Sequence, residues 1–161
     1  MITLAEYERS LLLELEIVKH LFTKIPLGSF DYQPTAKQRT MLELLRYLAR
    51  YATLGLKVRI ADDTAPFAAL AEEGAQVTPE NFLAAMDTQI EEVRTLLADV
   101  TPEQLAAEID PYKRGTPTTR AYQFIALLKQ YTAYKMQLFL YIKAAGNEDV
   151  ATSNLWAGKD P

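Results

Sequence analysis

Apolar residues recur at helical spacing along four stretches of the chain, and the longest stretch runs from residue 118 to residue 146. It contains no proline, and no glycine before Gly146. Its apolar residues fall at alternating steps of three and four, which is typical of a helix packed along its whole length against other helices: Phe124, Leu127, Tyr131, Tyr134, Leu138, Tyr141 and Ala145. Further apolar residues lie beside this stripe, so we expect 118–146 to be the most enclosed helix of a bundle.

The other three stretches each follow a capping signal, in which a side-chain oxygen accepts a hydrogen bond from a free backbone amide of the first turn. The signals are Thr3 with Glu6, Thr35 with Gln38, and Thr78 followed by a proline. They predict one helix from residue 3 to a stop at residue 26, a second from about residue 36 to about residue 58, and a third from residue 78 to about residue 100.

The connections between these helices are long. Residues 59–77 contain one short alanine-rich helix, PFAALAEE at 66–73. Thr101 and Gln104 repeat the capping signal and predict a short turn of helix, which an irregular segment at 110–117 follows. The 59–77 connection is long enough to cross the length of a helix, so the second and third helices need not be antiparallel neighbours.

The tail, residues 147–161, shows no periodic pattern, and we expect it to be irregular with Leu155 and Trp156 docked on the body. No segment of the chain alternates convincingly between apolar and polar residues as a half-buried strand would. The sequence therefore predicts a single domain, residues 1–161, whose fold class is all-α: a bundle of four helices with short extra helices in the long connections.

Composition and charge exclude several functions. The net charge is -4 and the basic residues are scattered, which argues against a nucleic-acid partner. The absence of cysteine removes disulfides, thiolate metal sites and a cysteine nucleophile, and the one histidine, His20, has no serine in a nucleophile turn to activate. The longest uninterrupted apolar run, 138–142, is far too short for a membrane span, and the first residues lack the basic start of a signal peptide. We expect a cytoplasmic protein with no membrane partner.

Two motifs point to a family. The segment MLELLRYLA at 41–49 is similar to the motif ELLxHLA, and QYTAYKMQLFLYIKAAG at 130–146 is similar to HxxxHxxQLxxYLRxxG. FDYQP at 30–34 is similar to an aromatic-proline turn that precedes the second helix in the same family. With its helices placed in this way, the chain resembles the DinB superfamily of four-helix bundles, which includes the bacillithiol transferases and related thiol S-transferases. The resemblance implies an up-down-down-up topology and a homodimer.

The resemblance also implies a site. In the metal-binding members, one histidine of the second helix and two of the fourth hold a divalent cation, and those positions fall here on Tyr47, Gln130 and Tyr134. A phenol binds metals well as phenolate, which its usual pKa of about 10 disfavours at neutral pH, and a glutamine amide oxygen is a weak ligand. The resemblance therefore implies a site that has lost the family's Zn or Ni. Glu43 and Tyr51, each one turn from Tyr47, complete the candidate pocket.

The sequence leaves two interpretations of this site open. Tyr47, Gln130 and Tyr134 either form a hydrogen-bonded cluster that fills the former metal site, or they line a pocket for a small molecule. Glu14 interrupts an apolar stripe and is expected either to pair with a basic or phenolic group or to lie just outside the core. His20 is expected to be partly exposed at an edge of the bundle.

Our leading hypothesis is a DinB-like bundle of unassigned function that is metal-free at the family site and binds a small molecule or a partner, with no catalytic residue assigned. One alternative is an enzyme related to the thiol S-transferases, in which Tyr47 or Tyr134 polarises a thiol or a substrate oxygen. Another is a structural or interaction protein in which helix faces bind a partner and no pocket exists.

Overall fold

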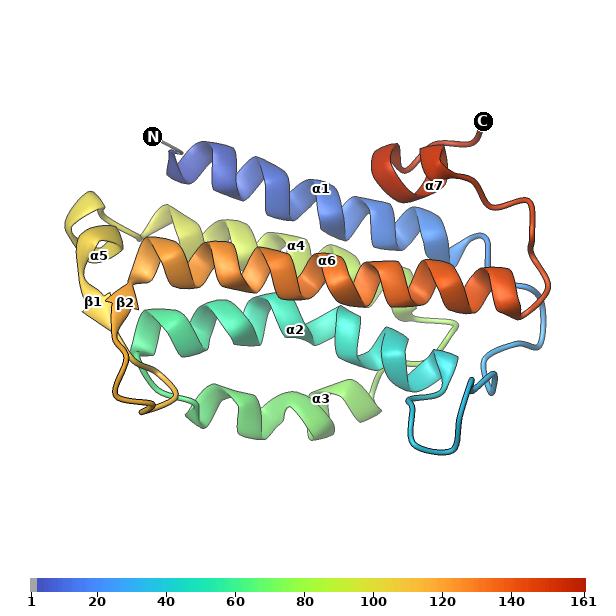
Figure 1. The fold of residues 1–161 in the computed structure, drawn as a ribbon, viewed down its shortest axis with the longest axis horizontal. Coiled ribbons are helices and arrows are strands. Elements are labelled where there is room, and N and C mark those ends of the chain that lie inside the picture. Colours follow the sequence, from blue (N-terminus) through green and yellow to red (C-terminus); the bar gives the residue numbers. More distant parts are fainter. Residues whose placement is uncertain (1–2) are drawn as a thin grey trace.

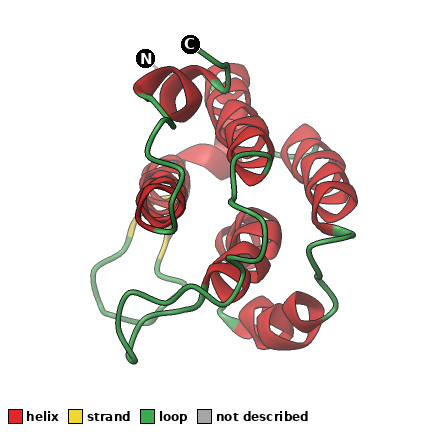
Figure 2. Cartoon of the chain, turned by 90° about the vertical axis from the view of Figure 1, so that its right-hand side faces the viewer, coloured by secondary structure: helices red, strands yellow, loops and turns green. Residues whose placement is uncertain are grey.

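Four long helices form the body of the molecule, and the structure, a computed structural model, describes residues 3–161 (Figure 1). They are α1 (Leu4–Phe22), α2 (Met41–Ala61), α4 (Phe82–Ala98) and α6 (Arg120–Ala144). Helices α1 and α6 point one way and α2 and α4 the other, which is the up-down-down-up order that the resemblance implies (Figure 1). Because α1 and α2 each pack against both α4 and α6, the four helices surround a common apolar interior (Figure 2). The predicted all-α bundle is confirmed.

Short elements occupy the connections, as the sequence predicts. A 3-10 turn (Ala65–Ala69) continues into α3 (Leu70–Ala75), both packed on α2, and α5 (Pro102–Ala106) lies against α6. The strands β1 (Glu108–Ile109) and β2 (Thr118–Thr119) pair in an antiparallel ladder that the sequence did not predict. Two residues are too few to show the alternation by which a strand is recognised.

Capping boxes begin α1 and α5 where they were predicted. At the start of α1 the Thr3 amide donates to a Glu6 carboxylate oxygen at 2.7 Å, and the Glu6 amide donates to the Thr3 hydroxyl at 3.2 Å. Thr101 and Gln104 make the same reciprocal pair at the start of α5. Each box satisfies two backbone amides that have no partner within the helix.

The predicted start of α2 is wrong by about one turn. The Thr35 hydroxyl does donate to the Gln38 side-chain oxygen at 3.0 Å, but this pair closes a turn and begins no helix. The capping box that begins α2 is formed by Thr40 and Glu43, and the first helical residue is Met41. Two similar motifs five residues apart compete for the helix start, and local pattern does not separate them.

The predicted start of α4 is wrong in the same way. Asn81, and not Thr78, is the residue that precedes the helix, which begins at Phe82. The Asn81 side chain accepts a hydrogen bond from the Thr78 amide at 2.9 Å and donates one to the Gln76 carbonyl at 2.9 Å. These bonds hold residues 78–81 in a turn, because an asparagine side chain competes well with the backbone for its partners.

Helix α2 is more enclosed than α6, which corrects the expectation that 118–146 would be the most enclosed helix. Of the 21 residues in α2, 13 are buried, against eight of the 25 in α6. The reason is that the 3-10 turn and α3 cover the side of α2 that faces away from the interior. Across the described range, 3–161, no helix has the length and apolar character that crossing a membrane requires.

The prediction that the C-terminal tail is irregular is wrong for part of the tail. Thr152–Ala157 form α7, which lies against α1. The Asn154 side-chain oxygen accepts from a backbone amide three residues earlier at 2.7 Å, and its nitrogen lies 3.0 Å from His20 Nε2. A helix this short, held by tertiary contacts, shows no periodic pattern. Leu155 is buried as expected, whereas Trp156 is 58% exposed.

A buried ion pair lies beneath α7. Lys135 has no exposed surface, and its Nζ lies 2.6 Å from a carboxylate oxygen of Glu14. The same nitrogen donates to the Leu155 carbonyl at 2.9 Å and lies 5.3 Å from the centre of the Trp156 ring. The expectation that Glu14 pairs with a basic or phenolic group is confirmed. The lysine that it pairs with was not anticipated, because Lys135 follows the apolar stripe of α6 by one position.

The hydroxyl of Tyr7 is buried, and its removal is expected to leave the fold intact or to stabilise it. The Tyr7 ring stacks on Phe124 at 5.3 Å, and its hydroxyl has no hydrogen-bond partner among residues 3–161. Burial raises the pKa of Tyr7, against a smaller opposing effect of the Arg59 charge. The folded state therefore holds the phenol proton more tightly than the unfolded state, so this contribution to stability is complete below about pH 10 and is lost as the pH rises further.

In Tyr7→Phe we expect a free energy of unfolding at pH 7 equal to that of the wild type or up to about 1 kcal/mol higher. Above about pH 10 the variant should lose less stability with rising pH than the wild type does. Tyr141→Phe is the matched control, because the Tyr141 hydroxyl donates to the Arg39 carbonyl at 3.1 Å and accepts from Gln137 at 2.7 Å. It is expected to lose about 1 kcal/mol. Urea denaturation at neutral and alkaline pH measures both, and equal losses in the two variants would contradict the assignment.

Candidate functional site

One face of α2 and one face of α6 meet at the positions that the resemblance singles out. Four residues of α2 at intervals of four lie toward α6: Tyr47, Tyr51, Gly55 and Arg59. From α6, Gln130 and Tyr134 approach this row one helical turn apart. The spacing of four keeps each set on one side of its helix, so the helix pairing alone brings the two sets together.

Three tyrosines of this face pack ring against ring, and we call Tyr47, Tyr51 and Tyr134 the tyrosine cluster. The Tyr47 ring centre lies 4.7 Å from that of Tyr51 and 4.7 Å from that of Tyr134. Tyr51 and Tyr134 meet edge to face at 5.6 Å. Phe67 of the 3-10 turn stacks on Tyr51 at 5.8 Å with the ring planes 4° apart. These separations are those of favourable aromatic pairs, so the cluster is filled by its own side chains.

Gln130 joins the tyrosine cluster to a buried arginine. Its side-chain oxygen accepts a hydrogen bond from the Tyr51 hydroxyl at 2.7 Å and another from Arg59 Nη2 at 3.1 Å. Arg59 is fully buried and donates also to the backbone carbonyls of Gln123 at 2.6 Å and Gly55 at 2.9 Å. An amide oxygen has two lone pairs, so both acceptor positions of Gln130 are used.

Gly55 makes this arrangement possible. A Cβ atom at Gly55 would lie 2.5 Å from Leu127 Cδ1 and 3.4 Å from Arg59 Nη1. At the first of these distances the Leu127 side chain, which is fully buried, would have to shift. The glycine therefore lets α6 approach α2 closely at the point where the Arg59 side chain folds back along its own helix.

A second guanidinium covers the other end of the tyrosine cluster. Arg39, just before α2, places its Cζ 4.3 Å from the centre of the Tyr47 ring and 5.7 Å from that of Tyr134. The electron-rich faces of the rings attract the cation. Among residues 3–161 no carboxylate forms an ion pair with Arg39 or Arg59, so the site is electrostatically positive.

Two tyrosines of the site, Tyr47 and Tyr51, stay protonated at neutral pH. Burial raises the pKa of Tyr47 far above its usual value, and the neighbouring Tyr134 and Tyr51 hydroxyls raise it further. Burial also raises the pKa of Tyr51, which the Arg59 charge partly opposes. At neutral pH these phenols can donate or accept hydrogen bonds, but they cannot act as phenolate bases or phenolate ligands.

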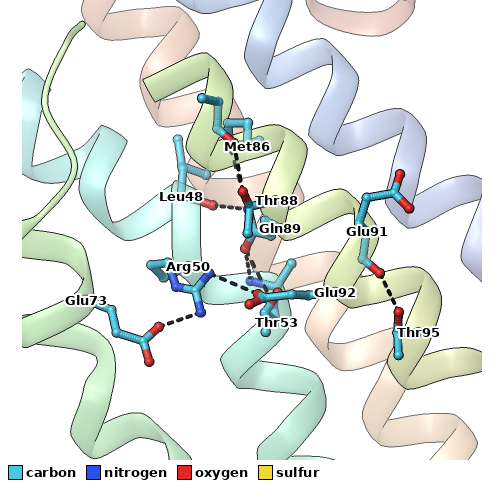
Figure 3. Close-up of polar contacts among 12 residues, drawn as sticks. Leu48, Arg50, Thr53, Glu73, Met86, Thr88, Gln89, Glu91, Glu92 and Thr95 are labelled. Atoms are coloured by element: carbon cyan, nitrogen blue, oxygen red, sulfur yellow. Dashed lines mark hydrogen bonds and ion pairs between the residues drawn. The ribbon is translucent and has the colours of Figure 1, made fainter. Parts of the chain in front are cut away.

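Gln89 of α4 anchors the turn of α2 between Tyr47 and Tyr51. Its amide reaches Leu48 (Figure 3) and Ala52, whose carbonyl and N–H lie four residues apart and pair with each other in a regular helix. Gln89 Nε2 donates to the Leu48 carbonyl at 2.9 Å, and its Oε1 accepts from the Ala52 amide at 3.0 Å. The side chain has no exposed surface. A buried amide with its partners in place joins α2 rigidly to α4 at the level of the site.

Arg50 holds α3 beside the site. Its guanidinium forms ion pairs with Glu73 of α3 and with Glu92 of α4, the latter at 2.9 Å (Figure 3). The result is an open groove of about 470 Å³ between the first half of α2 and the segment of the 3-10 turn and α3. The groove borders the tyrosine cluster through Tyr47, and Phe67 forms part of its opposite wall.

The residues present do not fit a divalent metal ion. The Gln130 oxygen is fully occupied by Tyr51 and Arg59, and Tyr47 is a neutral phenol. The Arg39 guanidinium lies over the Tyr47 ring and would repel a second cation. Within the described residues, no group of three or more His, Cys, Asp or Glu side chains is gathered as a metal site would need.

The structure brings together four of the five predicted site residues. Tyr47, Tyr51 and Tyr134 form the tyrosine cluster, and Gln130 is hydrogen-bonded to it. Glu43 has a different role. It lines the groove, but one carboxylate oxygen accepts from the amide of Thr40 at 2.7 Å, which commits it to capping α2. Of the two interpretations of Tyr47, Gln130 and Tyr134, the geometry favours the filled cluster.

Sequence reasoning missed Arg39, Arg59 and Phe67. A signal for Arg59 was present, since it continues the row of α2 residues spaced by four from Tyr47 and Tyr51. Arg39 and Phe67 lie outside the helices that carry the motif, so no periodicity connects them with it. His20 lies against the C-terminal tail, with its Nε2 3.0 Å from Asn154 Nδ2 and its side chain 18% exposed, and the expectation of a partly exposed edge residue is confirmed.

The fold itself can be compared with known proteins. The structure is similar to the crystal structure of YjoA, a DinB-like protein from Bacillus subtilis, with a TM-score of 0.69. The match covers 88% of this chain and 92% of that chain, at 22% sequence identity. The chain has a DinB-like fold. This likeness confirms the fold that the resemblance implies. No protein-family model and no curated protein matches the chain.

Proposed function

We propose that this protein is a DinB-like bundle that works without the divalent metal of the metal-binding members and binds a small molecule in the groove beside Tyr47. One observation carries the proposal: at the positions that hold the metal in the metal-binding members, the Gln130 oxygen is taken by Tyr51 and Arg59 and the Tyr47 ring packs on Tyr134 beneath the Arg39 guanidinium, while a groove of about 470 Å³ opens next to them. Grooves of this size suit small organic ligands.

The chemistry of the site supports binding rather than turnover. A metal in such a fold would lower the pKa of a bound thiol or water. Here Tyr47 and Tyr51 are neutral phenols and Arg39 and Arg46 are guanidiniums, which orient and stabilise a ligand but do not abstract a proton at neutral pH, and the carboxylate of the lining, Glu43, caps α2. A homodimer and a cytoplasmic location stay predictions from the sequence and its resemblance.

Metal analysis of tag-free protein tests the first half of this proposal. After purification in the presence of Zn or Ni, we expect a metal content well below one ion per chain. His20 is the only imidazole of the chain, so His20→Ala serves as a control that removes adventitious binding there. A stoichiometric ion that persists in His20→Ala and is lost in Tyr47→Phe or Tyr134→Phe would overturn the metal-free assignment.

Ligand screening by NMR tests the second half. A fragment library of mixed charge is expected to yield binders whose chemical-shift changes map to the first half of α2 and to α3. The control is the open groove that Lys57 of α2 and Asp87 of α4 line. The resonances of its residues should not shift with the same compounds. A library that shifts no resonance in the α2–α3 groove would count against small-molecule binding there.

A further inference from the structure

The two walls of the α2–α3 groove differ in chemistry. On the α2 side it is lined by Arg39, Glu43, Arg46 and Tyr47, and on the opposite side by apolar side chains that include Phe67 and Leu70. A ligand that fills it must therefore place charged or polar atoms along one edge and apolar surface along the other. This difference between the two walls restricts the class of ligand more than the volume of the groove does.

The polar wall is positively charged. Arg39 lies over the Tyr47 ring without an ion-pair partner among residues 3–161. The Nε–H of Arg46 donates a hydrogen bond to the Val77 carbonyl at 3.0 Å. This bond fixes the side chain and leaves its terminal nitrogens available to bind a ligand. Glu43 is the one carboxylate of the lining, and it is held by a backbone amide at the start of α2. Two arginines against one capped carboxylate leave a net positive charge.

The position of the Arg39 guanidinium suits an anion. A guanidinium held over an aromatic ring by its charge still carries N–H groups that can form paired hydrogen bonds to a carboxylate or a phosphate. Helix α2 also begins in this wall, and the positive end of its dipole favours a negative group there.

The apolar wall suits a flat ring. The Phe67 ring lies parallel to Tyr51 and lines the groove, with Leu70 beside it. Helix α3 passes close to Arg46 at this point, since a Cβ atom built on Gly74 would be in ordinary van der Waals contact with the Arg46 carbonyl oxygen, at 3.6 Å.

We propose that the ligand of the α2–α3 groove is a small aromatic anion, whose carboxylate or phosphate binds Arg39 and Arg46 and whose ring lies against Phe67 and Leu70. This inference rests on the proposed function, because it names the class of molecule that the groove takes. It assigns Arg39 the role of charge recognition, and the tyrosine cluster the role of the platform that positions Arg39.

A matched set of probes tests the inference on the full chain by NMR titration: benzoate, phenyl phosphate, benzamide, benzylamine and inorganic phosphate. We expect benzoate or phenyl phosphate to bind in the groove, and benzamide and benzylamine to bind at least about tenfold more weakly, because the charge-assisted hydrogen bonds are lost. Which of the two anions binds more tightly distinguishes a carboxylate ligand from a phosphate ligand.

Arg39→Gln is expected to weaken binding of the aromatic anions at least about tenfold while the thermal midpoint stays close to the wild-type value. Arg94→Gln is the matched control, since Arg94 is exposed on α4 and pairs with Glu91 away from the groove. Arg94→Gln should bind as the wild type does.

The failures can be told apart. Equal binding of benzamide and benzoate in the groove would overturn the anion assignment and leave small-molecule binding standing. Inorganic phosphate binding as tightly as phenyl phosphate would overturn the role of the apolar wall. If none of the five probes binds but neutral members of the mixed library do, the ligand class is wrong. If no compound of either set binds, both this inference and the proposed small-molecule binding are wrong.

Discussion

Lys135→Met is expected to lower the free energy of unfolding by about 3 kcal/mol, because it removes one partner of a buried ion pair. The change leaves the Glu14 carboxylate, whose side chain is 16% exposed, without its cation. It also leaves the Leu155 carbonyl without the donor that holds α7 to the bundle. Urea denaturation at pH 7, followed by far-UV circular dichroism, measures the loss.

A double variant separates the charge from the packing. Glu14→Leu combined with Lys135→Met replaces the pair by apolar side chains and is expected to recover most of the stability, since buried pairs are often no better than well-packed apolar residues. Lys19→Met is the control for an exposed pair. Lys19 bridges Glu16 and Asp87 at the surface, and its loss should cost less than about 1 kcal/mol. A double variant no more stable than Lys135→Met alone would contradict this explanation.

Gln89→Leu is expected to cost about 3 kcal/mol of stability and to disturb the site as well. The leucine fits the space roughly but leaves the Ala52 amide and the Leu48 carbonyl without the Gln89 amide that serves them both. Since Tyr47 and Tyr51 flank this turn of α2, their ring packing should change. Urea denaturation measures the stability, and near-UV circular dichroism reports the tyrosine environment.

Gln137→Leu is the matched control for this substitution. Gln137 is partly buried on α6 and makes one side-chain hydrogen bond, to the Tyr141 hydroxyl. Its replacement should cost about 1 kcal/mol and leave the near-UV spectrum of the tyrosine cluster unchanged. Wild-type stability in Gln89→Leu would mean that α2 closes its own hydrogen-bond ladder without Gln89, and the anchoring role would be withdrawn.

The sequence was sufficient to predict the bundle because its signals are long. Stripes such as Phe124, Leu127 and Tyr131 repeat over several turns, and each repeat adds to the same prediction. Helix starts depend instead on a few hydrogen bonds. Thr35 and Thr40 are each followed three residues later by a polar side chain able to complete a capping box, and tertiary contacts decide between them. The prediction failed at this level.

The site was predictable where it lies on helices and not where it depends on other segments. The resemblance to the family motifs implied that Tyr47, Gln130 and Tyr134 lie together, and helical spacing placed Gln130 and Tyr134 one turn apart; the structure brings the three together. Nothing local indicates that Arg39 folds back over Tyr47, or that Phe67 stacks on the cluster, because those contacts form only when the connections settle on the bundle. Whether the site is filled or open depends on such contacts.

The placement of Trp156 affects how any unfolding experiment on this protein must be interpreted. It is the only tryptophan of the chain, it belongs to α7, and its ring lies over the Lys135 ammonium. Tryptophan fluorescence therefore reports on the attachment of the last helix, whereas helical circular dichroism is dominated by the four long helices. A fluorescence transition that precedes the dichroic one would signal release of the tail from an intact bundle, and not an intermediate of the bundle itself.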